Sequence, residues 1–405
     1  MIDITLGGLL GQPDVSDYLR GIVQRGRYAN AYLFHGPAGV GKCTAALAFA
    51  RAVLCERVHG AALVDAGPSL FGEAPVEQSA RDGNDACGEC RGCRLSGSMQ
   101  HPDLQFLFPL SGEEKTLETT VAETLQAMRD DPLYVFQYEK AASIRISQTR
   151  ELLAELGYRP HTASRRVVVV RDCDRMREDQ FSALLKSVEE PGASTIWVLT
   201  TARLSRVPVT IRSRCQRVRF APLPEALIRQ TLQDAAEVDE KDARMLAALS
   251  GGSLARALAM RDAEPSMLEQ RDAALALLSP ALSGDMATLW KNVQGTTAFG
   301  KAGRERLRQT LEFHQLWLRD ILRLRYGAGV DQLVNRDKVT LLQQLATRID
   351  ASEIRRRLMV LEEALRSIDG NISPDLTLFS TLSRVGGQRL GEGVWPAHAT
   401  ARWDV

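Results

Sequence analysis

Residues 33–44 read L-F-H-G-P-A-G-V-G-K-C-T, an apolar strand end that runs into a glycine-rich loop and a lysine. The G-x4-G-K spacing is that of a Walker A loop, in which backbone N–H groups and one lysine surround phosphate oxygens. Apolar residues 32–35 predict a strand before the loop, and the alanine-rich stretch 44–54 predicts a helix after it. The pattern predicts an α/β fold with nucleotide-binding positions Gly36, Gly39, Gly41, Lys42, Cys43, Thr44, Asp172 and Thr200.

Two positions of this predicted site do not suit hydrolysis. Cys43 stands where a Walker A loop has Ser or Thr, and a thiol is a poor ligand for Mg²⁺. Thr44 is no simple substitute, because it lies about 100° further round the helix. The β-branched run 166–170 predicts a buried strand ending in Asp172, which either holds a metal through water or is a solvated turn residue. Cys173 follows where a catalytic glutamate would orient the attacking water, so we expect no hydrolysis. Whether ATP with Mg²⁺ binds at all is left open.

The cysteines predict a second site. Three are spaced two residues apart with glycines among them, an arrangement that lets the backbone wrap a tetrahedral metal: Cys87, Cys90 and Cys93. We expect structural Zn²⁺, with Cys55 as the fourth ligand and His59 or His101 as alternatives. An iron–sulfur site would want a cysteine at position 97, where Gly97 stands. The remaining alternative is a set of ordinary thiols without metal.

Composition limits the class of protein. The 405 residues predict two or three domains, and 51 Lys plus Arg against 50 Asp plus Glu leave a net charge of +1, so any contact with DNA must be local. The chain has no apolar stretch of roughly 18 residues and does not start with a basic and then apolar segment, which predicts a cytoplasmic protein without a membrane span. Seven cysteines, an odd number, argue against a disulfide scaffold.

The order of strand and helix patterns predicts the domain organisation. Apolar runs alternate with helical stretches in residues 1–222, which predicts a P-loop domain with helices on both faces of a parallel sheet and a zinc module at 55–93. We expect a mobile loop within 56–86 and a helix at 117–129 within a polar insertion at 111–140. Strand patterns fade after Pro222. The expected regions that follow are a small helical domain at 223–262, long amphipathic helices such as 305–326 and 352–368 in a region spanning 263–385, and a tail at 386–405.

Several motifs together resemble the bacterial clamp-loader AAA+ family. They are Gly11-Gln12, residues 31–42, the cysteine cluster, His101-Pro102-Asp103, and residues 184–191 and 210–215. The resemblance covers nearly the whole chain. The chain resembles those members of the family that lack the catalytic glutamate, because the gamma/tau ATPases of the family carry Asp-Glu where this chain has Asp172-Cys173. It implies a ring with gamma/tau and delta subunits, held by a C-terminal helical collar (263–385) after a helical lid (223–262), which loads a sliding clamp onto primed DNA.

The resemblance also implies a role for Arg214, within the family's Ser-Arg-Cys motif. Such an arginine reaches the γ-phosphate of a neighbouring subunit and stabilises charge in the transition state. The alternating residues 216–220 predict a strand, so Arg214 is expected on the turn before it, projecting outward. The alternatives are an exposed arginine in a weak salt bridge and Arg212 as the active residue.

Two sensor positions are less distinct. Thr200 or Thr201 matches a polar residue that senses the γ-phosphate in AAA+ proteins, although either could simply end a strand. Residues 252–256 resemble the second sensor, but Ala255 occupies the place of the arginine, which implies lost turnover.

Three functional hypotheses therefore remain from the sequence. The favoured one is a non-hydrolysing stator that lends Arg214 to its neighbour. The second is an active ATPase in which Cys43, Thr44 or a water-bridged Asp174 replaces the missing groups. The third, a zinc-dependent DNA-binding module, leaves the Walker A pattern unexplained.

Overall fold

The structure of the chain is a computed structural model. It describes residues 5–59, 83–110, 117–131, 133–136, 142–189, 194–261, 266–297, 303–368 and 373–387. Most of the predicted mobile loop within 56–86 and nearly all of the tail predicted at 386–405 lie outside the described residues.

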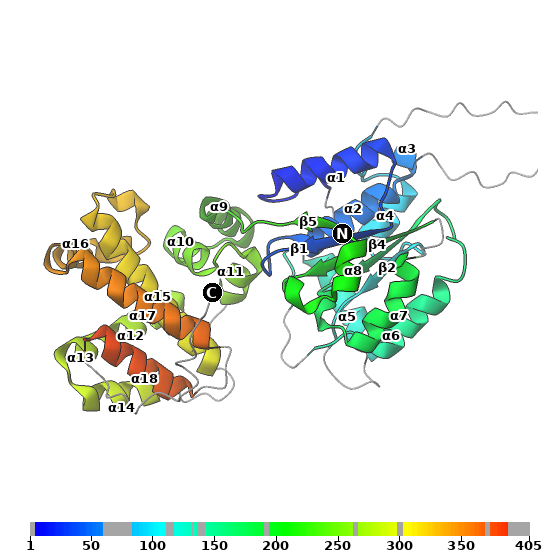
Figure 1. The fold of residues 1–405 in the computed structure, drawn as a ribbon. Coiled ribbons are helices and arrows are strands. Elements are labelled where there is room, and N and C mark those ends of the chain that lie inside the picture. The colour runs from blue at the N-terminus through cyan, green and yellow to red at the C-terminus, as the bar shows by residue number, and fades with distance from the viewer. Residues whose placement is uncertain are drawn as a thin grey trace, which may run out of the picture. The chain divides into compact units, whose positions relative to one another are not determined.

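The chain divides into two compact units (Figure 1). The first comprises Met1–Ile228 and Gly252–Leu258, and the second comprises Arg229–Gly251 and Ala259–Val405. Helices α9 (Glu225–Ala236) and α11 (Leu254–Arg261) therefore each contribute residues to both units. The predicted domain boundaries at residues 222, 262 and 385 stay a prediction.

A five-stranded parallel sheet forms the centre of the first unit. Its order is β2-β3-β4-β1-β5, with bounds β1 (Ala31–His35), β2 (Leu104–Leu107), β3 (Arg166–Val170), β4 (Thr195–Thr201) and β5 (Gln216–Arg219). All five residues of β3 are buried, as expected for a run of valines covered on both faces. Val218 and Phe220 point inward, which confirms the predicted alternation around β5.

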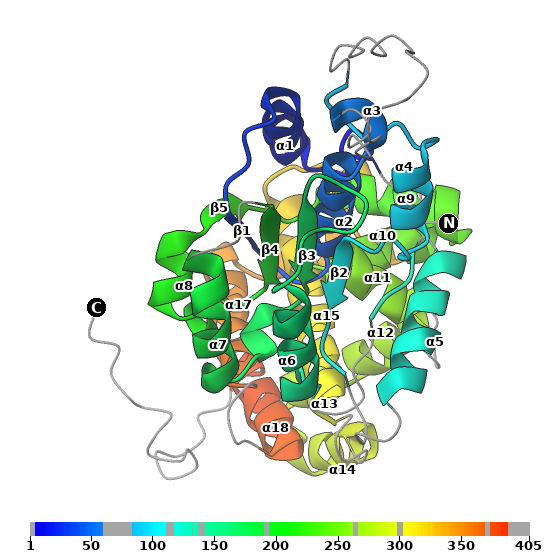
Figure 2. The same cartoon turned by 90° about the vertical axis from the view of Figure 1, so that its right-hand side faces the viewer.

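Helices cover both faces of this sheet (Figure 2). Helix α2 (Lys42–Val53) packs on one face together with α1 (Pro13–Arg25), while α6 (Ile146–Glu155), α7 (Glu178–Glu189) and α8 (Val209–Arg214) lie on the other. The fold class predicted from the sequence is thus confirmed. The other elements of this unit are α3 (Glu56–His59), α4 (Arg91–Gly97), α5 (Leu117–Asp130), η2 (Cys173–Arg175) and η3 (Leu204–Arg206).

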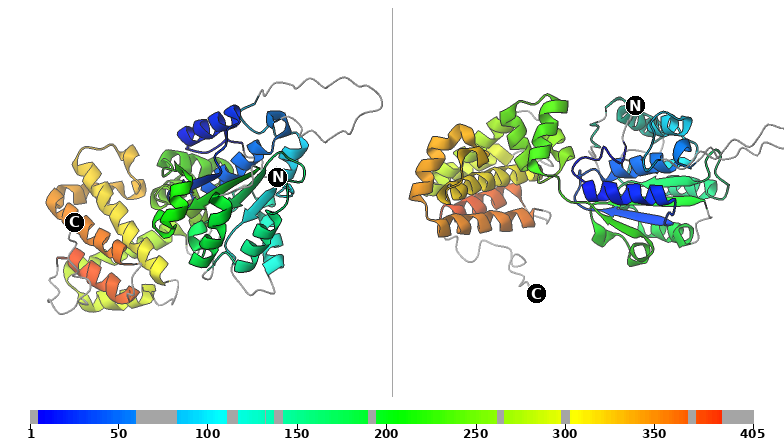
Figure 3. Two further views of the ribbon diagram at one scale, coloured as in Figure 1. Left: turned by 45° about the vertical axis from the view of Figure 1, so that its right-hand side comes forward. Right: turned by 90° about the horizontal axis from the view of Figure 1, so that it is seen from above.

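The described part of the second unit is helical. The two predicted amphipathic helices are confirmed as α15 (Gly303–Arg325) and α17 (Ala351–Ser367), which run side by side around a shared apolar core (Figure 3). The other elements are α10 (Glu240–Leu249), α12 (Met267–Ala276), α13 (Leu278–Ser283), α14 (Met286–Thr297), η5 (Val330–Gln332), η6 (Arg336–Lys338), α16 (Val339–Arg348) and α18 (Pro374–Val385). No described helix combines the length and apolarity needed to cross a membrane.

Local sequence explains where several helices begin. Ser266 and Glu269 form a reciprocal capping box at the start of α12, and the Asp239 and Asp350 carboxylates accept backbone N–H bonds at the starts of α10 and α17. Each cap satisfies N–H groups that have no partner inside the helix. Caps of this kind typically stabilise a helix by about 1 kcal/mol.

One histidine lies in the interior of the second unit. His314 of α15 is almost fully buried, and its Nε2 hydrogen-bonds the carbonyl oxygen of Ala274 at 2.8 Å. Burial lowers the pKa of His314 to about 4, because the charged imidazolium is poorly solvated there. The neutral ring, which donates through Nε2–H, is therefore the form that the folded unit holds near neutral pH.

Candidate functional site

The carboxyl ends of three parallel strands bring the predicted nucleotide-binding residues together. The loop 36–41 follows β1, Asp172 follows β3, and Thr200 lies near the end of β4 between them. The backbone N–H of Asp172 donates to Thr200 Oγ1 at 3.1 Å. Thr201 turns instead to Asp174. Of the two threonines predicted as sensors, Thr200 is thus the one that contacts Asp172.

The loop has the conformation that its glycines allow. Gly36 has a φ of +148°, and a Cβ on it would lie 2.3 Å from the carbonyl oxygen of Phe220, so no larger residue fits. The Lys42 ammonium donates to the Gly36 carbonyl at 2.9 Å and to the Pro37 carbonyl. Burial lowers the pKa of Lys42 to about 8, although the nearby Asp172 acts in the opposite direction. In this structure Lys42 therefore stabilises the loop by donating hydrogen bonds to the loop's backbone carbonyl groups.

Gln12 connects the loop to the segment after β5, a role that its sequence position does not reveal. Its Nε2 donates to the carbonyls of Ala221 at 2.8 Å and Val40 at 3.4 Å, and its Oε1 accepts from Ala221 N at 3.3 Å. The side chain is buried. From the sequence, Gly11-Gln12 indicates only the family resemblance, because no periodic pattern predicts a long-range contact of this kind.

The first turn of α11 packs directly on the loop. A Cβ on Gly39 would lie 2.1 Å from Ser253 Oγ, and Ala255 N donates to the Gly39 carbonyl at 3.5 Å. Ala255 stands where the second sensor would carry arginine, so no guanidinium comes from that position. The neighbouring Arg256 has its backbone N–H bonded to Ser253 Oγ at 3.2 Å.

Cys173 lies in the apolar core instead of facing the loop. Cys173 is 0% exposed and packs with Met176, Cys215 and other buried residues beneath α7 and α8. Burial raises the pKa of its thiol well above the ordinary value. A buried neutral thiol has neither the charge nor the position to activate a water molecule.

Asp174 is engaged in a structural ion pair. Its carboxylate accepts from Thr201 Oγ1 at 2.8 Å and from Arg203 Nε at 2.8 Å, and its side chain is 3% exposed. A buried carboxylate whose two oxygens each accept from a protein donor is poorly placed to bridge to a reacting water. This geometry counts against the hypothesis that Asp174 replaces the missing glutamate.

Arg171 is a further member of the site that the sequence did not identify. Its Nε donates to Asp172 Oδ2 at 3.3 Å, and its guanidinium carbon lies 3.6 Å from the centre of the Phe136 ring. Burial raises the pKa of the Cys43 thiol, while the charge of Arg171 and its hydrogen bond to the thiol act against that rise. A guanidinium thus lies among the Cys43 thiol, the Asp172 carboxylate and an aromatic ring.

Arg214 is exposed, but the prediction that it lies on a turn is wrong. It is the last residue of α8, and its Nη1 donates to the Thr210 carbonyl at 3.1 Å, one helical turn earlier. The helix forms because Pro208 precedes its first turn and Ile211 is fully buried against the core. Arg212, the alternative, is only half-buried and lies two residues earlier on the same short helix.

The four predicted cysteine ligands converge. The sulfur atoms of Cys55, Cys87, Cys90 and Cys93 all lie within 4.8 Å of one another, with Sγ–Sγ distances of 3.8 Å for Cys87–Cys93 and 3.9 Å for Cys90–Cys55. A tetrahedral zinc with bonds of about 2.3 Å requires sulfur–sulfur distances of about 3.8 Å. The cluster could therefore hold a metal ion, and its chemistry and spacing fit zinc.

Nearby groups hold this cluster in place. Arg51, which is buried, donates from Nε to the Cys93 carbonyl at 3.2 Å. A Cβ on Gly92 would lie 2.3 Å from the Leu54 carbonyl, so the helix that carries Cys93 packs closely on the chain before Cys55. Of the alternative ligands, His101 accepts a hydrogen bond from Asp103 N at 3.1 Å and is not in the cluster, while the His59 side chain lies outside the described residues.

The Asp103 side chain of the His-Pro-Asp motif is a structural anchor. It is fully buried and accepts from His161 N at 2.6 Å, Thr162 N at 2.8 Å, Thr162 Oγ1 at 3.0 Å and Ala163 N at 2.9 Å. These four bonds fix the loop before β3 to the start of β2. The motif therefore contributes to the geometry of the sheet and not to chemistry at the loop.

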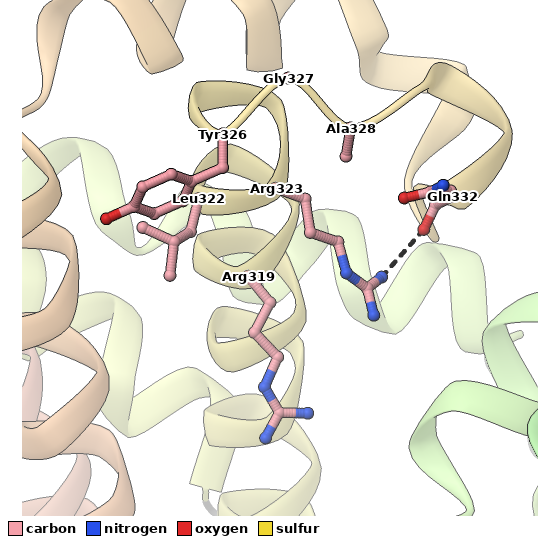
Figure 4. Close-up of a pocket in the computed structure, with 7 residues that line it drawn as sticks. All are labelled: Arg319, Leu322, Arg323, Tyr326, Gly327, Ala328 and Gln332. Atoms are coloured by element: carbon pink, nitrogen blue, oxygen red, sulfur yellow. Dashed lines mark hydrogen bonds between the residues drawn. The ribbon is translucent and has the colours of Figure 1, made fainter.

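A separate pocket of about 580 Å³ lies within the second unit (Figure 4). Arg319, Arg323 and Tyr326 of α15 and the turn after it form its walls together with Leu322, Gly327, Ala328 and Gln332. Arg323 Nη1 donates to the Gln332 carbonyl at 2.9 Å. None of the residues predicted from the sequence to form a site lines this pocket.

Comparison with known proteins identifies the family. The family model described as "DNA polymerase III, delta subunit" matches residues 11–67 and 69–224, and "DNA polymerase III, delta subunit, C terminal" matches residues 296–385. The chain is 31% identical to DNA polymerase III subunit delta' of Pseudomonas aeruginosa over 56% of its length and 55% of the relative. It is 27% identical to the delta' subunit of Escherichia coli over 81% of its length and 89% of the relative.

A tau subunit is also similar to this chain. DNA polymerase III subunit tau of Bacillus subtilis is 24% identical over 63% of this chain but only 36% of its own length. The chain thus spans about half or less of the length of two of these relatives, whereas it spans most of the Escherichia coli delta' subunit. The two family matches and the delta' relatives agree with each other. The chain therefore belongs to the DNA polymerase III delta subunit family and is similar to its delta' members.

Proposed function

We propose that this chain is the non-hydrolysing stator of a clamp loader, which assembles with gamma/tau and delta subunits and supports the loading of a sliding clamp onto primed DNA. In this role its one catalytic contribution is Arg214, supplied in trans to the nucleotide of a neighbouring subunit. The observation that carries the proposal is the burial of Cys173 in the apolar core, at the position of the catalytic glutamate.

Three further features support the absence of turnover. Cys43 offers sulfur where Mg²⁺ requires oxygen, Ala255 supplies no charge to the loop, and the Asp174 carboxylate is engaged by Thr201 and Arg203. Each of these departures removes a group that a hydrolysing site needs. Any nucleotide held at Lys42 therefore stays intact. The gamma/tau-like ATPase hypothesis has no specific observation in its favour.

The position of Arg214 supports its role as an arginine finger. It is exposed at the carboxyl end of the short helix α8, and the helix is anchored in the core by Ile211. A side chain on a fixed helix end projects outward with little loss of backbone freedom when it meets a partner. In well-studied phosphoryl-transfer enzymes a trans arginine increases the rate by roughly 10³- to 10⁵-fold.

The four-cysteine cluster is proposed to hold structural zinc. Cys55, Cys87, Cys90 and Cys93 leave no ligand position open for water, and a closed four-sulfur site is typical of structural zinc. Metal binding at such a site contributes to folding. The cluster connects the carboxyl end of α2 to the start of α4, which packs against α2.

Hydrolysis by the isolated chain tests the stator proposal. We expect steady-state ATP turnover at the background level, unchanged by Lys42→Ala. A turnover that Lys42→Ala abolishes would show an active ATPase and overturn the proposal.

A reconstituted loader tests the arginine finger. With gamma/tau, delta, clamp and primed DNA present, Arg214→Ala in this chain is expected to lower DNA-stimulated ATP hydrolysis by at least tenfold, while gel filtration shows an intact complex. Arg217→Ala, an exposed arginine on β5, is the matched control and leaves the rate unchanged. A loss with Arg212→Ala and none with Arg214→Ala would assign the role to Arg212.

A further inference from the structure

Strand geometry directs Arg171 toward the phosphate loop. Val168 and Val170 of β3 face the core beneath α6, α7 and α8, so the alternate position 171 faces the side of α2. There Arg171 meets Cys43 of α2 and Asp172, and it stacks on Phe136 with 3.6 Å between guanidinium carbon and ring centre. Its side chain is only 21% exposed.

The residues present do not fit the Mg²⁺ that accompanies nucleotides in P-loop proteins. Mg²⁺ requires oxygen ligands in near-octahedral geometry. Cys43 provides sulfur, and Asp172 Oδ2 already accepts from the Arg171 Nε. The Thr200 hydroxyl oxygen accepts a hydrogen bond from the backbone N–H of Asp172. A divalent ion at this position would also meet the positive charge of Arg171.

The same groups are well suited to bind phosphate oxygens. Lys42 and Arg171 contribute two positive charges at the amino end of α2, against the negative charge of Asp172. Asp174 also acts on Lys42, but its carboxylate is paired with Arg203. A guanidinium presents several N–H donors in one plane and matches phosphate better than a point charge does. The Phe136 ring fixes the orientation of the guanidinium before a ligand arrives.

We propose that Arg171 takes the place of the divalent metal, so that the phosphate loop of this chain is a binding site for a nucleoside triphosphate that does not require Mg²⁺. The Lys42 ammonium now donates to the carbonyl groups of Gly36 and Pro37. When a nucleotide binds, phosphate oxygens replace these carbonyl groups as its acceptors. Arg171 neutralises phosphate charge without polarising a water molecule. The site therefore binds without promoting hydrolysis, and this does not depend on any role of Arg214.

Equilibrium binding of ATP to the full chain, with either MgCl₂ or EDTA, tests the proposal by isothermal titration calorimetry. We expect binding in EDTA and a weaker apparent affinity in MgCl₂, because Mg²⁺ complexes most of the ATP there and that complex would place the ion against the charge of Arg171. Lys42→Ala is expected to abolish binding. Arg171→Gln removes the charge and is expected to weaken binding in EDTA by about 10- to 100-fold, the loss typical of one charge-assisted hydrogen bond. Arg177→Gln, an exposed arginine nearby, is the matched control and leaves the affinity unchanged.

Mn²⁺ provides a second, independent measurement. Electron paramagnetic resonance with MnCl₂ and ATP is expected to show no protein-held ion in the unsubstituted chain. Circular dichroism confirms that each variant is folded, and Arg171→Lys, which keeps the charge, is expected to retain part of the affinity if Arg171→Gln unfolds. The proposal is overturned by ATP binding that requires Mg²⁺, by binding that Arg171→Gln and Arg171→Lys leave unchanged, or by no ATP binding in either buffer.

Discussion

Restoring the missing glutamate is the most direct test of the buried position of Cys173. From the sequence alone, Cys173→Glu would be expected to return a catalytic carboxylate. In the structure this residue is 0% exposed and packs against apolar neighbours, so the introduced carboxyl enters the core. We therefore expect the substitution to destabilise the first unit and to produce no ATP turnover.

The expected cost follows from linkage. A carboxyl group with an unfolded pKa of about 4.3 that must stay protonated in the core costs about 1.4 kcal/mol per pH unit above that value, or roughly 4 kcal/mol at pH 7. The larger side chain adds about 1–3 kcal/mol of overpacking. The sum is comparable to the whole stability of many domains, which is about 5–15 kcal/mol.

The pH dependence separates the two contributions. Because the folded pKa is raised above the unfolded one, the ionisation penalty is absent below about pH 4.3 and grows as the pH rises. Urea unfolding, followed by circular dichroism and by hydrogen exchange of β3, is expected to show a deficit that increases by about 3 kcal/mol from pH 5 to pH 7. Cys173→Ala is the matched control, with a small loss that does not vary with pH. A stable Cys173→Glu variant at pH 8 that hydrolyses ATP would refute the buried placement.

Three other predictions concern stability and metal content. The pKa of His314 is lowered to about 4, so its contribution to stability is complete above about pH 6.5 and falls as the pH decreases. The loss should reach about 2 kcal/mol at pH 5. His314→Gln should remove this pH dependence from urea unfolding measured at pH 8 and pH 5. Asp103→Asn places an amide against backbone N–H donors and should cost roughly 3 kcal/mol, measured by thermal unfolding; a change below 0.5 kcal/mol would contradict the anchor role. Cys90→Ser should lower zinc content measured by atomic absorption, whereas the buried Cys215→Ser should not; equal zinc in both would contradict the proposed ligand set.

The sequence by itself determined those features that depend on local pattern. The glycine spacing after 32–35 specifies the loop, because few other residues tolerate its backbone conformation. The run of four valines at 167–170 favours a strand buried on both faces, and glycines among Cys87, Cys90 and Cys93 allow three thiols to point inward. Such signals are short in range, so they are readable without the fold. Even Cys55, the fourth cysteine of the cluster, can be predicted from its place at the end of the helix after the loop.

Tertiary structure alone decided which way the side chains of the site point. Cys173 faces the core, Asp174 pairs with Arg203, and Arg171 turns toward Cys43, although all three belong to one short segment. Their directions depend on the left-handed backbone of Asp172 and on elements packed from distant parts of the chain. Gln12 makes two of its bonds with Ala221, 209 residues away. A linear pattern records residue type and spacing, but contacts between distant segments form only when the sheet and its helices close around them.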